Sequence, residues 1–208
     1  MNVKIVFADI LSAAWKSYKS QCWLLTGLII GFTIIFSLLL LFATPTKGEP
    51  MSISGIIVYV ICFFLFCLFS MGYLRNCLQT LDNEEPQFSA FGQTSRKIFS
   101  FIAACLAFSV MIFVGCVLLL FPGIYLALRF QFFYTSMVDE DTGVIESFKR
   151  SWHMTKGQTR RLFILMLFHL LIVIFGLAAL GIGIFIATPL FLLMYGHAYR
   201  KLTAPDIC

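Results

Sequence analysis

Charged side chains are scarce in this sequence. Only 12% of its 208 residues are Asp, Glu, Lys or Arg, whereas soluble domains contain about 25%. Apolar residues make up 60% of the chain, and the mean hydropathy is +0.94. A soluble fold of this length could not cover so much apolar surface, because its polar side chains are too few. The composition therefore excludes an ordinary soluble domain and predicts an integral membrane protein surrounded by membrane lipids.

The sequence also lacks the motifs of common catalytic and metal sites. It contains no Gly-x-Ser-x-Gly and no phosphate-binding loop. Its 7 cysteines include no Cys-x-x-Cys pair, and its 3 histidines have no second ligand at metal-binding spacing. We therefore predict no metal, no cofactor and no enzyme activity. Nothing in the sequence predicts a nucleic-acid partner.

Long apolar runs are the main feature that is present. A helix that crosses a bilayer needs about 20 apolar residues, because it rises about 1.5 Å per residue through a hydrocarbon core of about 30 Å. Residues 162–199 form a run about twice as long, and we expect it to fold back near Gly176 and Gly181. Pro122 suits the first turn of a helix, so we expect it to divide the apolar stretch over residues 98–138 into two helices. The predicted membrane helices cover residues 22–43, 53–74, 98–121, 122–138, 162–178 and 182–199.

An amphipathic segment precedes each pair of predicted membrane helices. The first covers residues 1–21 and the third covers residues 143–158, and a weaker one begins near Phe88. These patterns predict an all-α integral membrane protein with a single domain over residues 1–208. Its six transmembrane helices are expected to form three hairpins, each preceded by an amphipathic helix on the cytoplasmic face.

We expect the amphipathic helices to lie in the headgroup layer, with their cations near anionic lipid and their apolar faces dipped toward hydrocarbon. Binding of a partner protein is the alternative role for the same faces. The apolar faces of the first and third segments include Ile10, Ala14, Tyr18, Ile145, Phe148 and Trp152. The residues expected at the interface are Trp15, Lys16, Lys149, Arg150, Trp152 and Lys156.

Basic residues set the expected orientation, because short loops rich in Lys and Arg stay on the cytoplasmic side. With both termini inside, Lys47 is the one basic residue expected on the outer side, and Arg129 lies within a helix. The remaining Lys and Arg residues fall on the inner side. We therefore predict a multi-pass protein of the cytoplasmic (inner) membrane with both termini in the cytoplasm.

Arg129 is an ionisable residue inside the predicted helix over 122–138. Burying such a group in a bilayer costs about 2.5 kcal/mol or more, so its position favours a specific role. Two interpretations stay open. One is a structural ion pair, for which the candidates are Asp139, Glu140 and Asp141. The other is a site for an anionic headgroup or ligand, formed by Arg129 with Gln131 and Tyr134.

Small residues and one proline are candidates for helix packing. Gly27 and Gly31 form a Gly-x-x-x-Gly face that permits close contact within the chain, with a membrane protein partner or in a homo-oligomer. Pro189 removes one backbone hydrogen bond from the last predicted helix and is expected to kink it.

The second half of the chain resembles a known family. The run LRFQFFYTSMVDEDTGVIESFKRSWHMTKGQTRRLFILML is followed by GIGIFIATPLFLLMYGHAYRKL. The positions that match the family pattern are Arg129, Asp139, Ser151, Trp152, Lys156, Gly157, Thr188, Pro189 and Tyr199. On these residues the chain resembles the bacterial six-helix membrane proteins related to the glycerophosphodiester phosphodiesterase membrane domain. The resemblance implies a fold rather than an activity, because the phosphodiesterase of fused members is a separate soluble domain whose metal-binding carboxylates are missing from this sequence.

These observations favour a noncatalytic integral membrane protein that binds lipids or assembles with a membrane partner. The alternative is a small transporter or flippase-like protein for an anionic amphiphile, with Arg129 in a membrane cavity. A membrane enzyme is the third class, and it would require a second polar cluster near Arg129, which the sequence scarcely offers.

Overall fold

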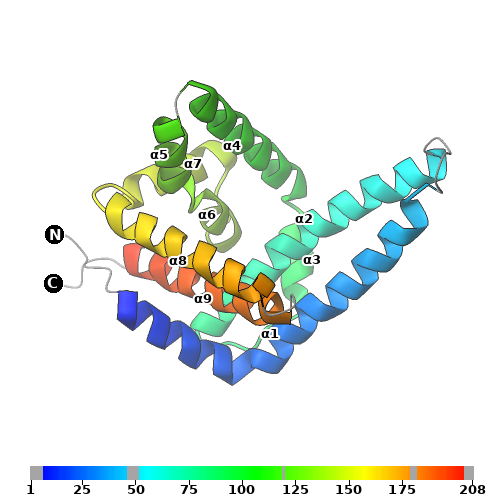
Figure 1. Ribbon diagram of the computed structural model, residues 1–208, viewed down its shortest axis with the longest axis horizontal. Helices are drawn as coiled ribbons and strands as arrows, with labels where there is room; N and C mark the ends of the chain where they lie inside the picture. Colours follow the sequence, from blue (N-terminus) through cyan, green and yellow to red (C-terminus); the bar gives the residue numbers. More distant parts are fainter. Residues whose placement is uncertain (1–6, 46–51, 119, 179–181, 204–208) are drawn as a thin grey trace.

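The computed structural model describes residues 7–45, 52–118, 120–178 and 182–203, and these residues form helices and connecting turns without a strand (Figure 1). The predicted all-α fold class is confirmed for this part of the chain. Gly181 and residues 1–6 of the first amphipathic segment lie outside the described residues. The helices are α1 (Phe7–Ala43), α2 (Ile53–Leu81), α3 (Ser89–Ser95), α4 (Ile98–Leu118), α5 (Leu120–Phe130), α6 (Phe133–Asp139), α7 (Val144–Met154), α8 (Thr159–Ala178) and α9 (Ile182–Thr203).

Four stretches within these helices are long and apolar enough to cross a membrane. They are Ala8–Ala43, Ile53–Leu81, Ile98–Val117 and Thr159–Gly176. Their outward faces expose large apolar side chains, such as Trp23 and Phe42, which water would not favour. The length, composition and exposed apolar faces of these helices indicate a membrane protein.

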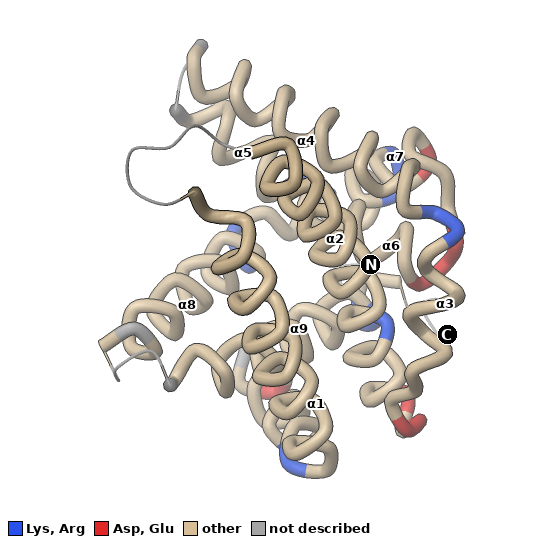
Figure 2. Tube along the Cα trace, turned by 90° about the vertical axis from the view of Figure 1, so that its right-hand side faces the viewer, with Lys and Arg blue, Asp and Glu red and all other residues tan. Residues whose placement is uncertain are grey.

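Sequential helices pack side by side. α1 packs on α2, α4 on α5 and α8 on α9, and α9 also packs along α1 and α2 (Figure 1). In Figure 2 most of the charged segments lie toward the right and lower side of the molecule, and one basic segment lies further left near α8, while the described helix ends at the far left contain none. We call the side with most of the charged segments the charged side.

The first part of α1 belongs to the protein core. α1 bends at Gln21, where the backbone angles leave the helical region (φ −129, ψ 19). Before this bend Ile10, Ala14 and Tyr18 are buried in the same cluster as Tyr199 of α9. The prediction that this apolar face dips into the headgroup layer is therefore wrong, because α9 covers it instead.

The segment predicted as one helix over 122–138 consists of two helices. α5 ends at Phe130 and α6 begins at Phe133. The break frees backbone groups, and α7 binds them: Ser151 Oγ donates to the carbonyl of Arg129 at 2.9 Å, and the Phe132 N–H donates to Ser151 Oγ at 3.1 Å. These bonds join residues about twenty positions apart in the sequence, so helical periodicity alone does not reveal the break.

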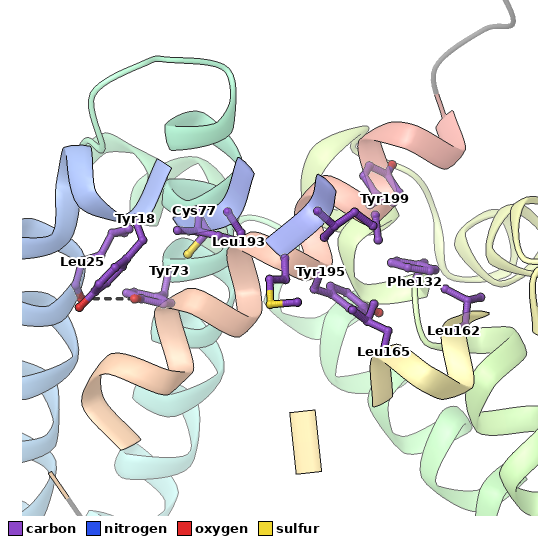
Figure 3. Packing of buried hydrophobic residues seen from close by; sticks show 14 of the residues in the cluster. Tyr18, Leu25, Tyr73, Cys77, Phe132, Leu162, Leu165, Leu193, Tyr195 and Tyr199 are labelled. Atoms are coloured by element: carbon purple, nitrogen blue, oxygen red, sulfur yellow. Dashed lines mark hydrogen bonds between the residues drawn. The ribbon is translucent and has the colours of Figure 1, made fainter. Parts of the chain in front are cut away.

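α9 lies in the centre of the larger core cluster (Figure 3). At one end of the cluster the Tyr73 hydroxyl donates to the carbonyl of Leu25 at 3.3 Å. At the other end Phe132 stacks on Tyr195 with ring centroids 4.5 Å apart. The aromatic residues that follow the α5–α6 break are thereby packed against α9.

Gly176 and Gly183 bring α8 and α9 into close contact. A Cβ atom added to Gly183 would lie 2.8 Å from the Cα of Gly176, a separation that real Cβ atoms do not tolerate. Only glycine permits this approach of two backbones. Gly27 and Gly31 differ, because a Cβ at either position would meet no atom within 4 Å. The packing predicted for Gly27 and Gly31 is therefore not used inside the chain.

We expect Gly183→Ala to destabilise the protein by about 1–3 kcal/mol, because the added methyl group forces the backbones of α8 and α9 apart. Thermal unfolding in detergent measures the loss. Gly31→Ala is the matched control, since its methyl group meets open space and alanine favours a helix. Equal unfolding temperatures for the two variants would contradict the close contact.

Candidate functional site

Three consecutive carboxylates at the end of α6 contact three other parts of the chain. We call Asp139, Glu140 and Asp141 the acidic turn. Arg200 of α9 binds Asp139 at 2.8 and 3.1 Å, and Lys97 before α4 binds Asp141 at 2.7 Å. The partners of Glu140 are Arg150 of α7 and the hydroxyl of Tyr199. The acidic turn therefore links α6 to α4, α7 and α9.

Arg200 and Arg75 stabilise the charge of Asp139. Burial raises the pKa of the Asp139 carboxyl above its ordinary value of 3.8, while Arg200 and Arg75 act in the opposite direction. Arg200 also binds Asp82 at 2.5 Å. Arg75 donates from Nη1 to the carbonyls of Val138 and Asp139 at 2.8 and 3.2 Å. Arg75 thus lies at the C-terminal end of α6, where a cation is favoured.

Arg129 does not pair with the acidic turn. Its side chain is only 3% exposed, and its guanidinium lies 4.0 Å from the ring centre of Trp152 and 5.9 Å from that of Tyr125. Among the described residues no carboxylate lies within ion-pair distance, and its buried Nε has no hydrogen-bond partner. The ion pair predicted between Arg129 and Asp139 or Glu140 is wrong, because cations from other elements occupy these carboxylates. A cation–π contact with Trp152 takes its place.

Gln131 and Tyr134 do not converge on Arg129. The Tyr134 hydroxyl donates to the carbonyl of Ser70 in α2 at 2.5 Å. The carbonyl of Gln131 accepts a hydrogen bond from Tyr195 in α9, and its buried side-chain nitrogen has no partner among the described residues. These two residues therefore contact different helices.

α7 presents hydroxyl groups to the protein and apolar groups to its surroundings. Ser147, Ser151 and Thr155, which we call the hydroxyl stripe, are completely buried. Thr155 Oγ1 also donates to the carbonyl of Arg129 at 3.0 Å. Ile145 is 71% exposed. The resemblance included Ser151, but the sequence analysis missed this stripe, although its members recur every four residues and so share one helical face.

The residues predicted for the interface lie on accessible surfaces. Trp15, Lys16, Lys149, Arg150 and Lys156 are exposed, and Trp152 is half-buried. On α7 an open groove of about 340 Å³ is lined by Phe130, Ile145, Phe148, Trp152, Lys149 and His153. Apolar side chains thus lie beside basic ones, as is typical of a helix in the headgroup layer.

Gly27, Gly31 and Pro189 lie away from this groove. A second apolar groove of about 490 Å³ includes both glycines together with Trp23 and Phe91. Pro189 lies inside α9, where the neighbouring Thr188 hydroxyl donates to the carbonyl of Ile184 at 2.8 Å. No group of three or more possible metal ligands gathers within the described parts of the chain.

We expect Arg200→Gln to destabilise the protein by about 1–2 kcal/mol at neutral pH, because it leaves the buried Asp139 carboxylate with fewer partners and Arg200 is itself partly exposed. Without Arg200 the pKa of Asp139 rises further. The folded protein then tolerates the neutral acid better than the carboxylate, so the deficit should shrink as pH falls through that raised pKa. Thermal unfolding at neutral and mildly acidic pH measures this.

Lys201→Gln is the control for this measurement, since Lys201 makes a longer contact of 3.9 Å with the exposed Asp9. We expect it to change stability little. A deficit of Arg200→Gln that stays constant over the pH range would show that Asp139 is not the group that Arg200 stabilises.

A family model matches residues 22–207, and its description is a domain of unknown function, DUF7847. No curated protein and no solved structure matches the chain. The resemblance to the phosphodiesterase-related membrane proteins stays a prediction. Because the family model covers nearly the whole sequence, this chain belongs to the DUF7847 family.

Proposed function

We propose that this protein is a noncatalytic integral membrane protein that binds anionic lipids at the cytoplasmic face of the inner membrane. The observation that carries the proposal is the orientation of α7. Its hydroxyl stripe is buried against the α5–α6 break, so Ile145 and the groove of Phe148 and Trp152 face outward beside Lys149. An exposed apolar groove with a basic rim matches the chemistry of an acyl chain joined to an anionic headgroup.

Two lysines of α7 and the turn after it are available to lipid. Lys149 and Lys156 are exposed and make no ion pair with the described residues. Arg150, by contrast, is held by Glu140. Each basic residue near an anionic membrane contributes about 1 kcal/mol of attraction. Lys149 and Lys156 are therefore the cations that we assign to the headgroups.

The topology that we propose has six crossings. α1 after Gln21, α2, α4, α8 and α9 would each form one crossing. α5 has 11 residues and rises only about 17 Å, so the fourth crossing would need α5 together with α6 up to Val138. The position of most charged segments on the charged side in Figure 2 supports placing both termini at the cytoplasmic face.

The environment of Arg129 favours lipid binding over transport. A transporter for an anionic amphiphile would use Arg129 in a water-filled membrane cavity, where the guanidinium could meet the substrate. In the structure Arg129 is covered by Trp152 and is almost fully buried. This position supports a packing role for Arg129 and leaves ligand contact to the exposed lysines.

We expect the double variant Lys149→Gln, Lys156→Gln to bind phosphatidylglycerol about thirtyfold more weakly than the wild type, because two headgroup attractions of about 1 kcal/mol each are lost. Native mass spectrometry of the full chain, titrated with phosphatidylglycerol or phosphatidylcholine, counts the lipids retained and also reports any oligomer or partner.

Lys47→Gln is the matched control, since the proposed topology has Lys47 on the opposite side of the membrane. It should retain phosphatidylglycerol as the wild type does. An equal loss in the control, or a wild type that does not distinguish phosphatidylglycerol from phosphatidylcholine, would refute the proposal.

A further inference from the structure

A cavity of about 600 Å³ lies on the charged side of the molecule, away from the α7 groove. α2 contributes Met71 and Arg75 to its lining, α3 contributes Ser89 and Gln93, and α6 contributes Met137. A volume of this size is typical of small-molecule sites. Arg96 and Lys97, which connect α3 to α4, also line the cavity, so three helices and this connection define it.

The lining of the cavity has an excess of unpaired positive charge. Its cations are Arg75, Arg96 and Lys97, and its carboxylates are Asp139 and Asp141. Each carboxylate already has a cation partner, since Arg200 binds Asp139 and Lys97 binds Asp141. Arg75 and Arg96 form no ion pair with the described residues. The cavity can therefore accept an anion without displacing an existing pair.

Arg75 is held in place for such contact. Its Nη1 donates to the carbonyls of Val138 and Asp139, which fixes the guanidinium at the wall of the cavity. Its Nε and Nη2 donors make no hydrogen bond with the described residues and stay available. Arg96 is exposed at the end of α3, and its side chain makes no hydrogen bond with the described residues. Two guanidinium groups from different elements can share the oxygens of one phosphate group.

Apolar residues around the cavity favour a lipid as the source of that phosphate. Met71, Met137 and Val138 line the cavity itself. Next to α3 and at the start of α4, Phe88 is 82% exposed and Phe99 is 74% exposed. Exposed phenylalanines beside basic residues are typical of segments whose apolar face dips below the headgroup layer, where the phosphate groups of lipids lie.

We propose that this cavity binds the phosphate group of an anionic lipid, with Arg75 and Arg96 as its donors. The inference rests on the proposed lipid-binding function, and it adds a second site that is built from the ends of α2, α3 and α6 rather than from the surface of α7. Lipid at this site would be held within a cavity and exchange more slowly than lipid on the open groove.

Arg96→Gln is the principal test, because the Arg96 side chain makes no ion pair or hydrogen bond with the described residues. We expect it to weaken the tightest phosphatidylglycerol site about three- to tenfold in native mass spectrometry of the full chain. Arg160→Gln, which removes an equally exposed cation outside the cavity, should leave that site unchanged. Arg75→Gln should weaken lipid binding at this site further. Because this variant also loses the hydrogen bonds to α6, its thermal unfolding is measured as well.

The outcomes separate this proposal from the proposed function. If the wild type prefers phosphatidylglycerol but Arg96→Gln and Arg160→Gln behave alike, the cavity assignment fails and lipid binding by α7 stands. If neither lipid is preferred, both fail. Inorganic phosphate or glycerol phosphate serves as the soluble probe in a thermal-shift titration. A contrary result is that these anions protect the wild type as strongly as phosphatidylglycerol does, with the protection lost in Arg96→Gln. That result would refute the proposal that the ligand is a lipid.

Discussion

The hydrogen bonds between α7 and the broken helix α5–α6 are the interaction on which much of this structure depends. A helix that breaks near a membrane leaves backbone groups without partners, and hydrocarbon offers none. Ser151 and Thr155 satisfy the carbonyl of Arg129, and Ser151 also accepts from the N–H of Phe132. Because these hydroxyls must face inward, the apolar residues of α7 must face outward. The capping of one break thus sets which face of α7 is exposed.

The same break sets where the acidic turn lies. α6 begins again at Phe133 and ends at Asp139, at the charged side of the fold. There the turn meets Arg200 and Lys97, which come from parts of the chain far apart in sequence. The turn holds α9 more firmly than it holds α4, because the Asp139 side chain that binds Arg200 is only 12% exposed, whereas the Asp141 side chain that binds Lys97 is 85% exposed. Packing of Phe132 on Tyr195 supports the same arrangement.

The presence of the long helices could be predicted from the sequence, whereas the break between α5 and α6 could not. α2 begins at Ile53, the first residue of its apolar run. Gly176 lies at the close contact of α8 with α9. Both features could be predicted, because the length of an apolar run and the position of a small residue are visible in the local sequence. The end of α2 was placed at residue 74, but the helix continues to Leu81. Its last turns are buried by other helices, and this tertiary burial leaves no local pattern in the sequence.

The site residues show the same division. Arg129 could be identified as unusual from its apolar surroundings, but its partner could not, because the aromatic ring of Trp152 reaches it from another helix. Conversely, Arg75 and Arg200 looked like ordinary flanking cations. Their roles depend on the position of α6, which follows from a break that sequence periodicity does not report. The hydroxyl stripe of α7 had a visible spacing, but no local signal shows that Ser151 caps a break in another helix.

The two kinds of arginine in this protein suit different tasks. Arg129 is buried beneath an aromatic ring near the C-terminal end of α5, where the helix dipole and the ring stabilise its charge without a carboxylate. A cation in that position stabilises packing, but an exchanging ligand cannot reach it. Arg75 and Arg96 line an accessible cavity with donors left over. Burial therefore marks Arg129 as structurally important, while their place in an accessible cavity makes Arg75 and Arg96 the better candidates for the lipid phosphate that we propose as a ligand.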